Sequence, residues 1–191
     1  MSKRGLSNEV ITAQAVKLIE EKGYYSFSLR ELAASLGVKP ASLYNHISGI
    51  NEILVNVATF AAEKLNVMLK DAMLGKPADE AFLEGTRAYR RFAAENHELY
   101  EAFIHMPTYE DENLIRVGFK SFEPMRTVIG YYTNDEAFIV NFIRSIRSAM
   151  HGFVELTSNG FMQRADISRD ETYEVMIDHF LKILKEAESN E

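Results

Sequence analysis

The chain carries the stretch SLRELAASLGVKPASLYNHISGINEIL from Ser28 to Leu54, which predicts two short helices around a tight turn. The first helix opens with a capping box, because Ser28 can accept a hydrogen bond from the backbone N–H of Glu31, whose side chain can reach back. Gly37 tolerates the positive φ of the turn, and Pro40 suits the first position of the second helix. The pattern therefore predicts a helix-turn-helix.

The second helix of this motif separates an inward side from an outward side. Leu43 and Ile47 are predicted to face inward, which leaves small and polar residues free to face a groove of double-stranded DNA. These outward candidates are Lys39, Ala41, Ser42, Tyr44, Asn45 and His46. Asparagine suits adenine and serine suits several partners, but neither defines a base sequence. On the flanking helix, Ser28 and Arg30 are candidates for phosphate contacts.

The composition is that of an ordinary globular chain of 191 residues, 47% hydrophobic and 26% charged. No apolar run is long enough to span a bilayer and no export signal is visible, so we expect a cytoplasmic protein with no membrane partner. The absence of cysteine excludes disulfides and thiolate metal ligands. The net charge is −7, but residues 1–50 carry six Lys and Arg against four Asp and Glu. A basic head on an acidic body can dock on DNA through one end.

Helical periodicity and breaker residues predict an all-α chain, and no strand pattern persists anywhere. The helices are expected over residues 7–22, 51–74, 79–94, 96–105, 111–131, 133–158 and 168–187, besides the two of the motif. Capping boxes at Thr133–Glu136 and Ser168–Glu171 open the last two. We therefore expect a three-helix DNA-binding head over residues 1–50 and a larger helical body over residues 51–191.

A set of residues in and around the motif matches a known pattern. The set comprises Leu32-Ala33, the turn Leu36-Gly37-Val38, Leu43-Tyr44 with His46, and Glu52 followed by Ile53-Leu54. On these residues the segment resembles the DNA-binding domain of TetR-type transcriptional regulators. The resemblance implies a ligand-responsive regulator, usually a repressor, with the Tyr44 hydroxyl against a phosphate. The family usually places a phosphate-binding lysine near the start of the next helix, where this chain has Ile50.

The last two predicted helices are apolar over wide arcs, so each must be covered on more than one side. They can lie at the centre of a monomer core, or they can form a four-helix interface between two chains. In TetR-type regulators the last two long helices form the dimer interface, so the resemblance favours a homodimer. The candidate interface residues are Phe153, Tyr173, Ile177, Phe180 and Leu184.

Aromatic residues are dense between positions 82 and 153. A cavity lined by aromatic side chains with a few polar groups is how apolar ligands are usually held, although a packed core makes the same sequence pattern. The candidate residues for a pocket that binds a small-molecule effector are Phe82, Tyr89, Phe92, Tyr100, Phe103, Phe119, Phe122, Phe142, Arg147, Met150 and His151.

Catalytic and metal-binding signatures are absent from the sequence. There is no Gly-x-Ser-x-Gly elbow, phosphate loop or dinucleotide fingerprint, and no histidine pair has the four-residue spacing of a helical metal site. We therefore expect no enzyme activity, no metal and no cofactor. Two alternatives stay open: a helical enzyme or ligand carrier whose motif is incidental, and a DNA binder that responds to no effector.

Overall fold

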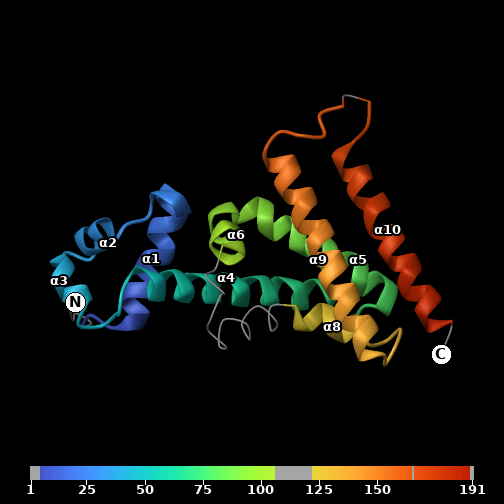
Figure 1. Ribbon diagram of the computed structural model, residues 1–191, viewed down its shortest axis with the longest axis horizontal. Helices are drawn as coiled ribbons and strands as arrows, with labels where there is room; N and C mark the ends of the chain where they lie inside the picture. The colour runs from blue at the N-terminus through green and yellow to red at the C-terminus, as the bar shows by residue number, and fades with distance from the viewer. Residues whose placement is uncertain (1–4, 106–121, 165, 190–191) are drawn as a thin grey trace. The chain divides into compact units, whose positions relative to one another are not determined.

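The computed structural model describes residues 5–105, 122–164 and 166–189, and every regular element in these ranges is helical, as predicted (Figure 1). The elements are α1 (Asn8–Lys22), the 3-10 turn η1 (Tyr24–Ser26), α2 (Leu29–Ser35), α3 (Pro40–Leu43), α4 (Ile50–Met73), α5 (Ala78–Glu95), α6 (His97–Ile104), α8 (Glu123–Ile129), α9 (Glu136–Ser158) and α10 (Arg169–Glu188). Of the helix expected over residues 111–131, the part before residue 122 lies outside the described residues. No helix within these ranges combines the length and apolar character needed to cross a bilayer.

The chain folds as two compact units, each drawn from two segments. The first contains Met1–Lys64 and Ala94–Phe119, and the second contains Leu65–Ala93 and Lys120–Glu191. Helices α4 and α5 contribute residues to both units, because the boundaries fall within them. The helix-turn-helix therefore belongs to the first unit, and the pair α9 and α10 belongs to the second.

The helix ends of the first unit are set by residues that the sequence singled out. Ser7 and Ser28 cap α1 and α2 through their hydroxyl groups, each of which accepts a backbone N–H. Gly23 and Gly37 follow these helices with φ angles of 97° and 69°, a conformation that glycine adopts without steric cost. The core gathers fully buried side chains from four helices, namely Ile11, Ile19, Leu32, Leu43 and Ile53.

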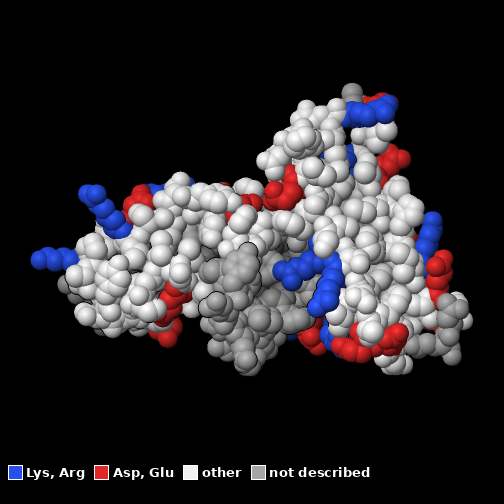
Figure 2. Space-filling model, in the orientation of Figure 1, with Lys and Arg blue, Asp and Glu red and all other residues white. Residues whose placement is uncertain are grey.

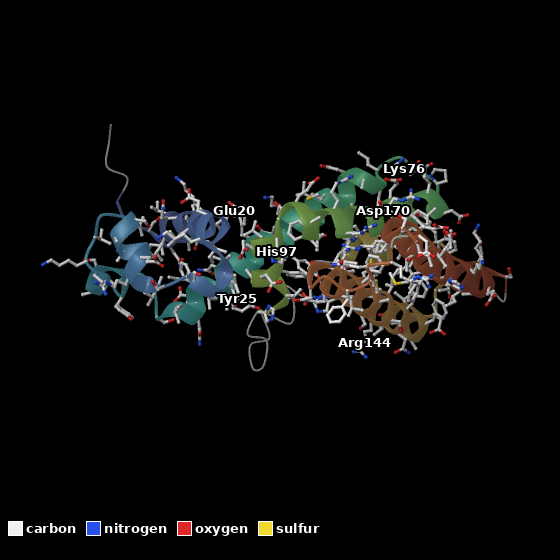
Figure 3. The ribbon with its side chains drawn as sticks, turned by 90° about the horizontal axis from the view of Figure 1, so that it is seen from above. Glu20, Tyr25, Lys76, His97, Arg144 and Asp170 are labelled. Carbon is white, nitrogen blue, oxygen red and sulfur yellow. The ribbon has the colours of Figure 1, made fainter. Side chains whose placement is uncertain are left out.

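Helix α6 packs on α1 and η1 within the first unit, although the sequence placed this helix in the body. The Glu98 carboxylate accepts the backbone N–H of Tyr24 at 2.6 Å. The hydroxyl of Tyr25, labelled in Figure 3, donates to the Glu101 carboxylate at 2.9 Å. Burial, and then the charge of Glu101, raise the pKa of Tyr24. Since these contacts join residues 74 and 76 positions apart, no local pattern could reveal them.

In the second unit, α5, α9 and α10 contribute to an aromatic core. Its buried side chains include Phe82, Tyr89, Phe92, Phe142, Ile146, Met150 and Tyr173. Helices α9 and α10 are neighbours joined by a loop over residues 159–168 (Figure 1). Asp135, rather than the expected Thr133, caps α9, because its carboxylate accepts the N–H groups of Ala137 and Phe138. The Thr133 hydroxyl accepts the N–H of Asp135 instead.

Ion pairs hold α10 against α5. The Arg87 guanidinium donates to both oxygens of Glu174, at 3.0 and 2.6 Å, and Arg90 binds Asp170. The Arg90 guanidinium also lies 4.9 Å from the centre of the Tyr173 ring. Exposed pairs contribute little to stability, but several together orient a helix. They mark the side of α10 that faces α5.

Tyr173 is fully buried, and its hydroxyl donates to the backbone carbonyl of Thr86 at 2.7 Å. Burial raises the pKa of this phenol, so it remains a donor at neutral pH. We expect Tyr173→Phe to lower the free energy of unfolding by about 1 kcal/mol, because a buried hydrogen bond is lost. Urea unfolding measures the change, with Tyr131→Phe as the control because Tyr131 is 69% exposed. Equal effects of the two substitutions would contradict the prediction.

Candidate nucleic-acid interface

The helix-turn-helix consists of α2, the turn at Gly37 and the short helix α3. Lys39 precedes α3, and Pro40 occupies its first position, as the sequence predicts. Leu43 and Ile47 are 0% and 4% exposed, which confirms the predicted inward side. Because four residues are too few to be stable as an isolated helix, α3 depends on its packing against α2.

The outward side of α3 and of the turn after it is open to solvent. Lys39, Ala41, Tyr44, Asn45 and His46 are exposed, and Ser42 is half-buried. The Tyr44 side chain is 58% exposed, so its ring is not part of the core of the unit. This side offers an ammonium, a phenol, an imidazole, an amide and a hydroxyl group. Such groups bind phosphate oxygens and base edges.

The two phosphate-contact candidates on the flanking helix, Ser28 and Arg30, differ in whether their side chains are available to DNA. The Ser28 hydroxyl accepts the N–H of Glu31 and donates to its carboxylate, so the helix cap occupies it. The same carboxylate binds Lys22 at 2.8 Å. The hydrogen bond from Lys22, followed by its charge and the bond from Ser28, lowers the pKa of Glu31. Arg30 is exposed and can reach a phosphate.

The loop after α3 is held by Glu52, a residue that the sequence singled out only through the family resemblance. Its carboxylate accepts the backbone N–H of Ser48 at 2.7 Å and the Ser48 hydroxyl at 2.8 Å. It also accepts from the side-chain amide of Asn8 at 2.9 Å. The backbone bond from Ser48, followed by the bond from its hydroxyl, lowers the pKa of Glu52. A serine shortly before a glutamate at a helix start was the available sequence signal.

Basic side chains project from the α2–α3 end of the first unit, where Arg30 and Lys39 are exposed (Figure 2). Elsewhere in this unit, the acidic Glu20 of α1 pairs with Lys64 of α4 at 3.6 Å. A cationic edge attracts the phosphates of DNA, and its contribution weakens as salt rises. The charge distribution thus favours contact with DNA through this end.

The residues predicted to line an effector pocket fall in both units. Phe82, Tyr89, Phe92, Phe122, Phe142 and Met150 are buried in the second unit, and Tyr100 and Phe103 are buried in the first. The Tyr89 and Phe122 ring centroids lie 5.7 Å apart, and the Arg147 guanidinium lies 5.0 Å from the Phe122 centroid. His151 is half-buried, and Phe119 lies outside the described residues. Most of the set therefore forms one aromatic core in the second unit.

A surface depression of about 280 Å³ lies beside α8 and the start of α9. Its lining residues are Glu123, Arg126, Thr127, Gly130, Tyr131 and Ile139. None of the effector-pocket residues that lie in the described ranges lines it. Its open, partly charged walls differ from the apolar pocket that the sequence predicts.

Most residues predicted for a dimer interface are buried within one chain. Phe153, Tyr173, Ile177 and Leu184 are at most 4% exposed. Phe180 is half-buried, and its ring packs edge-on against Phe142 at 5.6 Å. A side chain already buried in one protomer cannot add contact area to a second copy, so the four belong to the protomer core. The exposed large apolar side chains of α9 and α10 are instead Leu156, Val175 and Ile183.

A short exposed helix behind a tight turn, supported by a small helical core, is the geometry of a helix-turn-helix domain, the element that many DNA-binding regulators place in the major groove. Residues 11–57 match the bacterial regulatory proteins of the tetR family, and residues 82–180 match the tetracyclin repressor-like C-terminal domain. The chain belongs to the tetR family. It is therefore a DNA-binding transcriptional regulator with a repressor-like C-terminal domain.

Two relatives are similar along most of the chain. The uncharacterized HTH-type transcriptional regulator Rv0681 of Mycobacterium tuberculosis is 30% identical over 173 residues, which cover 90% of this chain and 78% of that protein. The uncharacterized HTH-type transcriptional regulator YobS of Bacillus subtilis is 28% identical over 162 residues, which cover 85% and 84%. Both matches extend through the head and the body.

Solved structures share the fold at lower identity. A protein of unknown function from Rhodococcus sp. RHA1 superposes with a TM-score of 0.77 at 21% identity, covering 97% of this chain and 100% of that one. BioQ, solved with its natural double-stranded DNA operator, superposes with a TM-score of 0.65 at 20% identity, covering 94% and 98%. At these identities the likeness shows that the fold is shared.

Proposed function

We propose that the protein is a homodimeric repressor that binds a near-palindromic operator and leaves it when a small molecule binds. Residues 1–50 form the DNA-binding domain in this proposal, and residues 51–191 form the effector-binding and dimerisation domain. The observation that best supports DNA binding is the solvent-exposed polar side of α3, whose opposite side is buried through Leu43 and Ile47. A dimer presents two such helices about 34–36 Å apart, the spacing of successive major grooves. The protein acts in the cytoplasm, where it reaches chromosomal DNA.

The exposed groups around α3 divide into phosphate contacts and base contacts. Phosphates are bound by Lys39, Tyr44, His46 and Arg30, and base edges are faced by Ala41, Ser42 and Asn45. Ser28 contributes by capping α2, since its hydroxyl is occupied there. The division follows from the chemistry of the side chains. Their access to DNA is supported by the exposure of all of them except half-buried Ser42, and by the fold shared with BioQ, which was solved with its operator.

Separate Lys39→Ala and Tyr44→Phe variants test the recognition helix. We expect both to weaken binding to a duplex that the wild-type protein selects from a random-sequence pool. Lys39→Ala should lower the log–log salt slope by about one, because one fewer counterion is released. Tyr44→Phe should weaken binding without that change, since it removes a neutral hydrogen bond.

Fluorescence anisotropy across a salt series measures both effects, and circular dichroism checks that helicity is unchanged. Lys70→Ala and Tyr131→Phe are the controls, because both positions are exposed in the second unit. If both test variants bind the selected duplex normally, α3 is not the recognition helix.

The dimer forms through an open side of α9 and α10 whose eight residues include no Asp, Glu, Lys or Arg. On α9 this side consists of Ser145, Ser148, Gly152 and Leu156, and on α10 of Thr172, Met176, His179 and Ile183. Residues spaced by three and four positions share one side of a helix, so each set is continuous. Arg144 projects away from α9 in Figure 3 and is not part of this side. Two copies of such a face make an isologous four-helix interface.

The effector binds among the buried aromatic residues of the second unit. The support is the match of residues 82–180 to a repressor-like domain, and the presence of the Arg147 guanidinium 5.0 Å from the centre of the Phe122 ring. Half-buried His151, on the same helix as Arg147, is a second candidate polar group. Met150 is flexible and adapts to varied apolar shapes. Because the rings contact one another, a ligand must displace them, and it selects a conformation in which the core is open.

Apolar and amphipathic molecules that bind this core should raise the melting temperature and release the selected duplex. A molecule at 100 times its dissociation constant should add about 2.7 kcal/mol to the free energy of unfolding. A thermal-shift screen followed by anisotropy measures both effects. If stabilising molecules leave the duplex bound, the protein binds DNA without an effector. If no duplex is selected at all, a helical carrier or enzyme is the better description.

A further inference from the structure

The groups proposed to contact DNA lie on α3 and the turn after it, a segment too short to be stable as an isolated helix. Helix α3 has four residues, and three of the proposed contacts, Tyr44, Asn45 and His46, lie in the turn that follows it. Buried Leu43 and Ile47 hold the inward side of this segment. Only Ser48 and Gly49 separate Ile47 from the start of α4, so a contact that fixes Ser48 also fixes the C-terminal end of the segment that carries the three contacts.

One carboxylate ties this loop to two helices. Glu52, in the first turn of α4, accepts the backbone N–H and the hydroxyl of Ser48 through one oxygen, at 2.7 and 2.8 Å. Its other oxygen accepts from the amide of Asn8, in the first turn of α1, at 2.9 Å. Asn8 in turn accepts from the amide of Asn56, one turn further along α4, at 3.0 Å. The network therefore joins α1, α4 and the loop after α3.

We propose that Glu52 is a positioning residue for DNA recognition, which holds the loop after α3 so that Tyr44, Asn45 and His46 meet the duplex together. The inference rests on the proposed DNA-binding function. Glu52 acts through Ser48 and not on DNA itself, because both of its oxygens accept protein hydrogen bonds and a carboxylate repels phosphate. Hydrogen bonds to an ionised carboxylate are roughly twice as strong as neutral ones.

The ionisation of Glu52 agrees with this role. The bonds from Ser48 lower its pKa, so its contribution to folding is complete above the ordinary carboxylate pKa. That contribution is lost only as the pH falls through the lowered value of the folded protein. The loop is therefore held throughout the neutral range.

Glu52→Gln keeps the size of the side chain and removes one acceptor. A glutamine carbonyl can still accept from Ser48, but the glutamine NH₂ group then faces the NH₂ group of Asn8, donor against donor. We expect the affinity for the selected duplex to fall about tenfold. Binding to calf-thymus DNA should weaken less than binding to the selected duplex, because Lys39 and Arg30, the cations assigned to phosphates, lie outside the loop that Glu52 holds.

The matched control is Glu63→Gln, which removes the same charge from an exposed position of the same helix. It should leave the preference for the selected duplex unchanged. A rescue variant combines Glu52→Gln with Asn8→Asp, so that the glutamine amide donates to the new carboxylate. That carboxylate can still accept from Asn56. Since the net charge then equals that of the wild-type protein, recovered affinity for the selected duplex reports the restored bond.

The two readouts separate positioning from folding and from direct contact. The proposal requires Glu52→Gln to keep its helicity and its salt slope, lose its preference for the selected duplex, and regain it in the rescue variant. Equal binding by Glu52→Gln and Glu63→Gln would overturn it while leaving the DNA-binding function intact. Loss of helicity, or failure of the rescue, would also overturn it. If the wild-type protein selects no duplex, the DNA-binding function itself fails.

Discussion

Ile183→Asp is expected to give a monomer whose affinity for the selected duplex is lower by about 10²- to 10⁴-fold, because one head binds without the avidity of two. Ile183 is 43% exposed and lies on the uncharged side of α10. In an isologous interface the substitution buries two carboxylates, one from each copy. Burial of an unpaired charge costs several kcal/mol, and an isologous dimer bears this cost twice, so we expect it to dissociate.

Light scattering at micromolar concentration and anisotropy on the selected duplex measure the two effects. Lys182→Asp is the control, because it places the same carboxylate one position away, on the side of α10 that carries Asp178. It should leave the dimer intact. A monomeric wild-type protein would show that no such dimer forms. An Ile183→Asp variant that stays dimeric would show that the interface lies elsewhere.

A charge at Phe180 is a less informative test. The sequence suggests this position for the interface, but the Phe180 ring packs edge-on against Phe142 inside the protomer. An aspartate there would disturb the core of the second unit as well as any interface. Loss of the dimer would then have two explanations, which Ile183→Asp avoids.

Leu43→Ala is expected to destabilise the first unit by about 2–5 kcal/mol, the usual cost of a buried leucine truncated to alanine. Leu43 is 0% exposed and is the residue through which the four-residue helix α3 reaches the core. Because α3 has little stability of its own, the recognition side should lose its shape and binding to the selected duplex should be lost.

Hydrogen exchange resolves where the stability is lost, since a chain of two units need not unfold in one step. Protection should fall in α2 and α3 and persist in α9 and α10. Val67→Ala is the control, because it truncates a residue that is 57% exposed on α4. Unchanged protection of α3 in Leu43→Ala would show that this helix is held by other contacts.

The helix-turn-helix was predictable because its determinants are local. The Ser28 cap, the turn at Gly37, the start at Pro40 and the inward Leu43 lie within sixteen residues, and each acts through backbone chemistry or helical spacing. The exposure of Lys39 and its neighbours follows from the same spacing. Their roles on DNA stay predictions, since exposure shows access and not contact.

The hydrogen-bond network of Glu52, which holds the loop after this motif, was harder to predict from the sequence. Glu52 was singled out by the family resemblance, but one of the three hydrogen bonds to its carboxylate comes from Asn8, 44 positions earlier. The partners of the apolar residues on α9 and α10 were also not predictable from local sequence. Periodicity shows that a helix side is apolar, but not which neighbour covers it.

The sequence by itself determined the helical class of the fold, the caps at Ser28 and Ser168, and the exposed side of α3, because these depend on residues within a few turns of one another. Only the tertiary structure decided that α6 closes the unit of the helix-turn-helix, through contacts of Glu98 and Glu101. It also decided that Tyr173 faces the protomer core, since that choice is made by packing between segments distant in the chain.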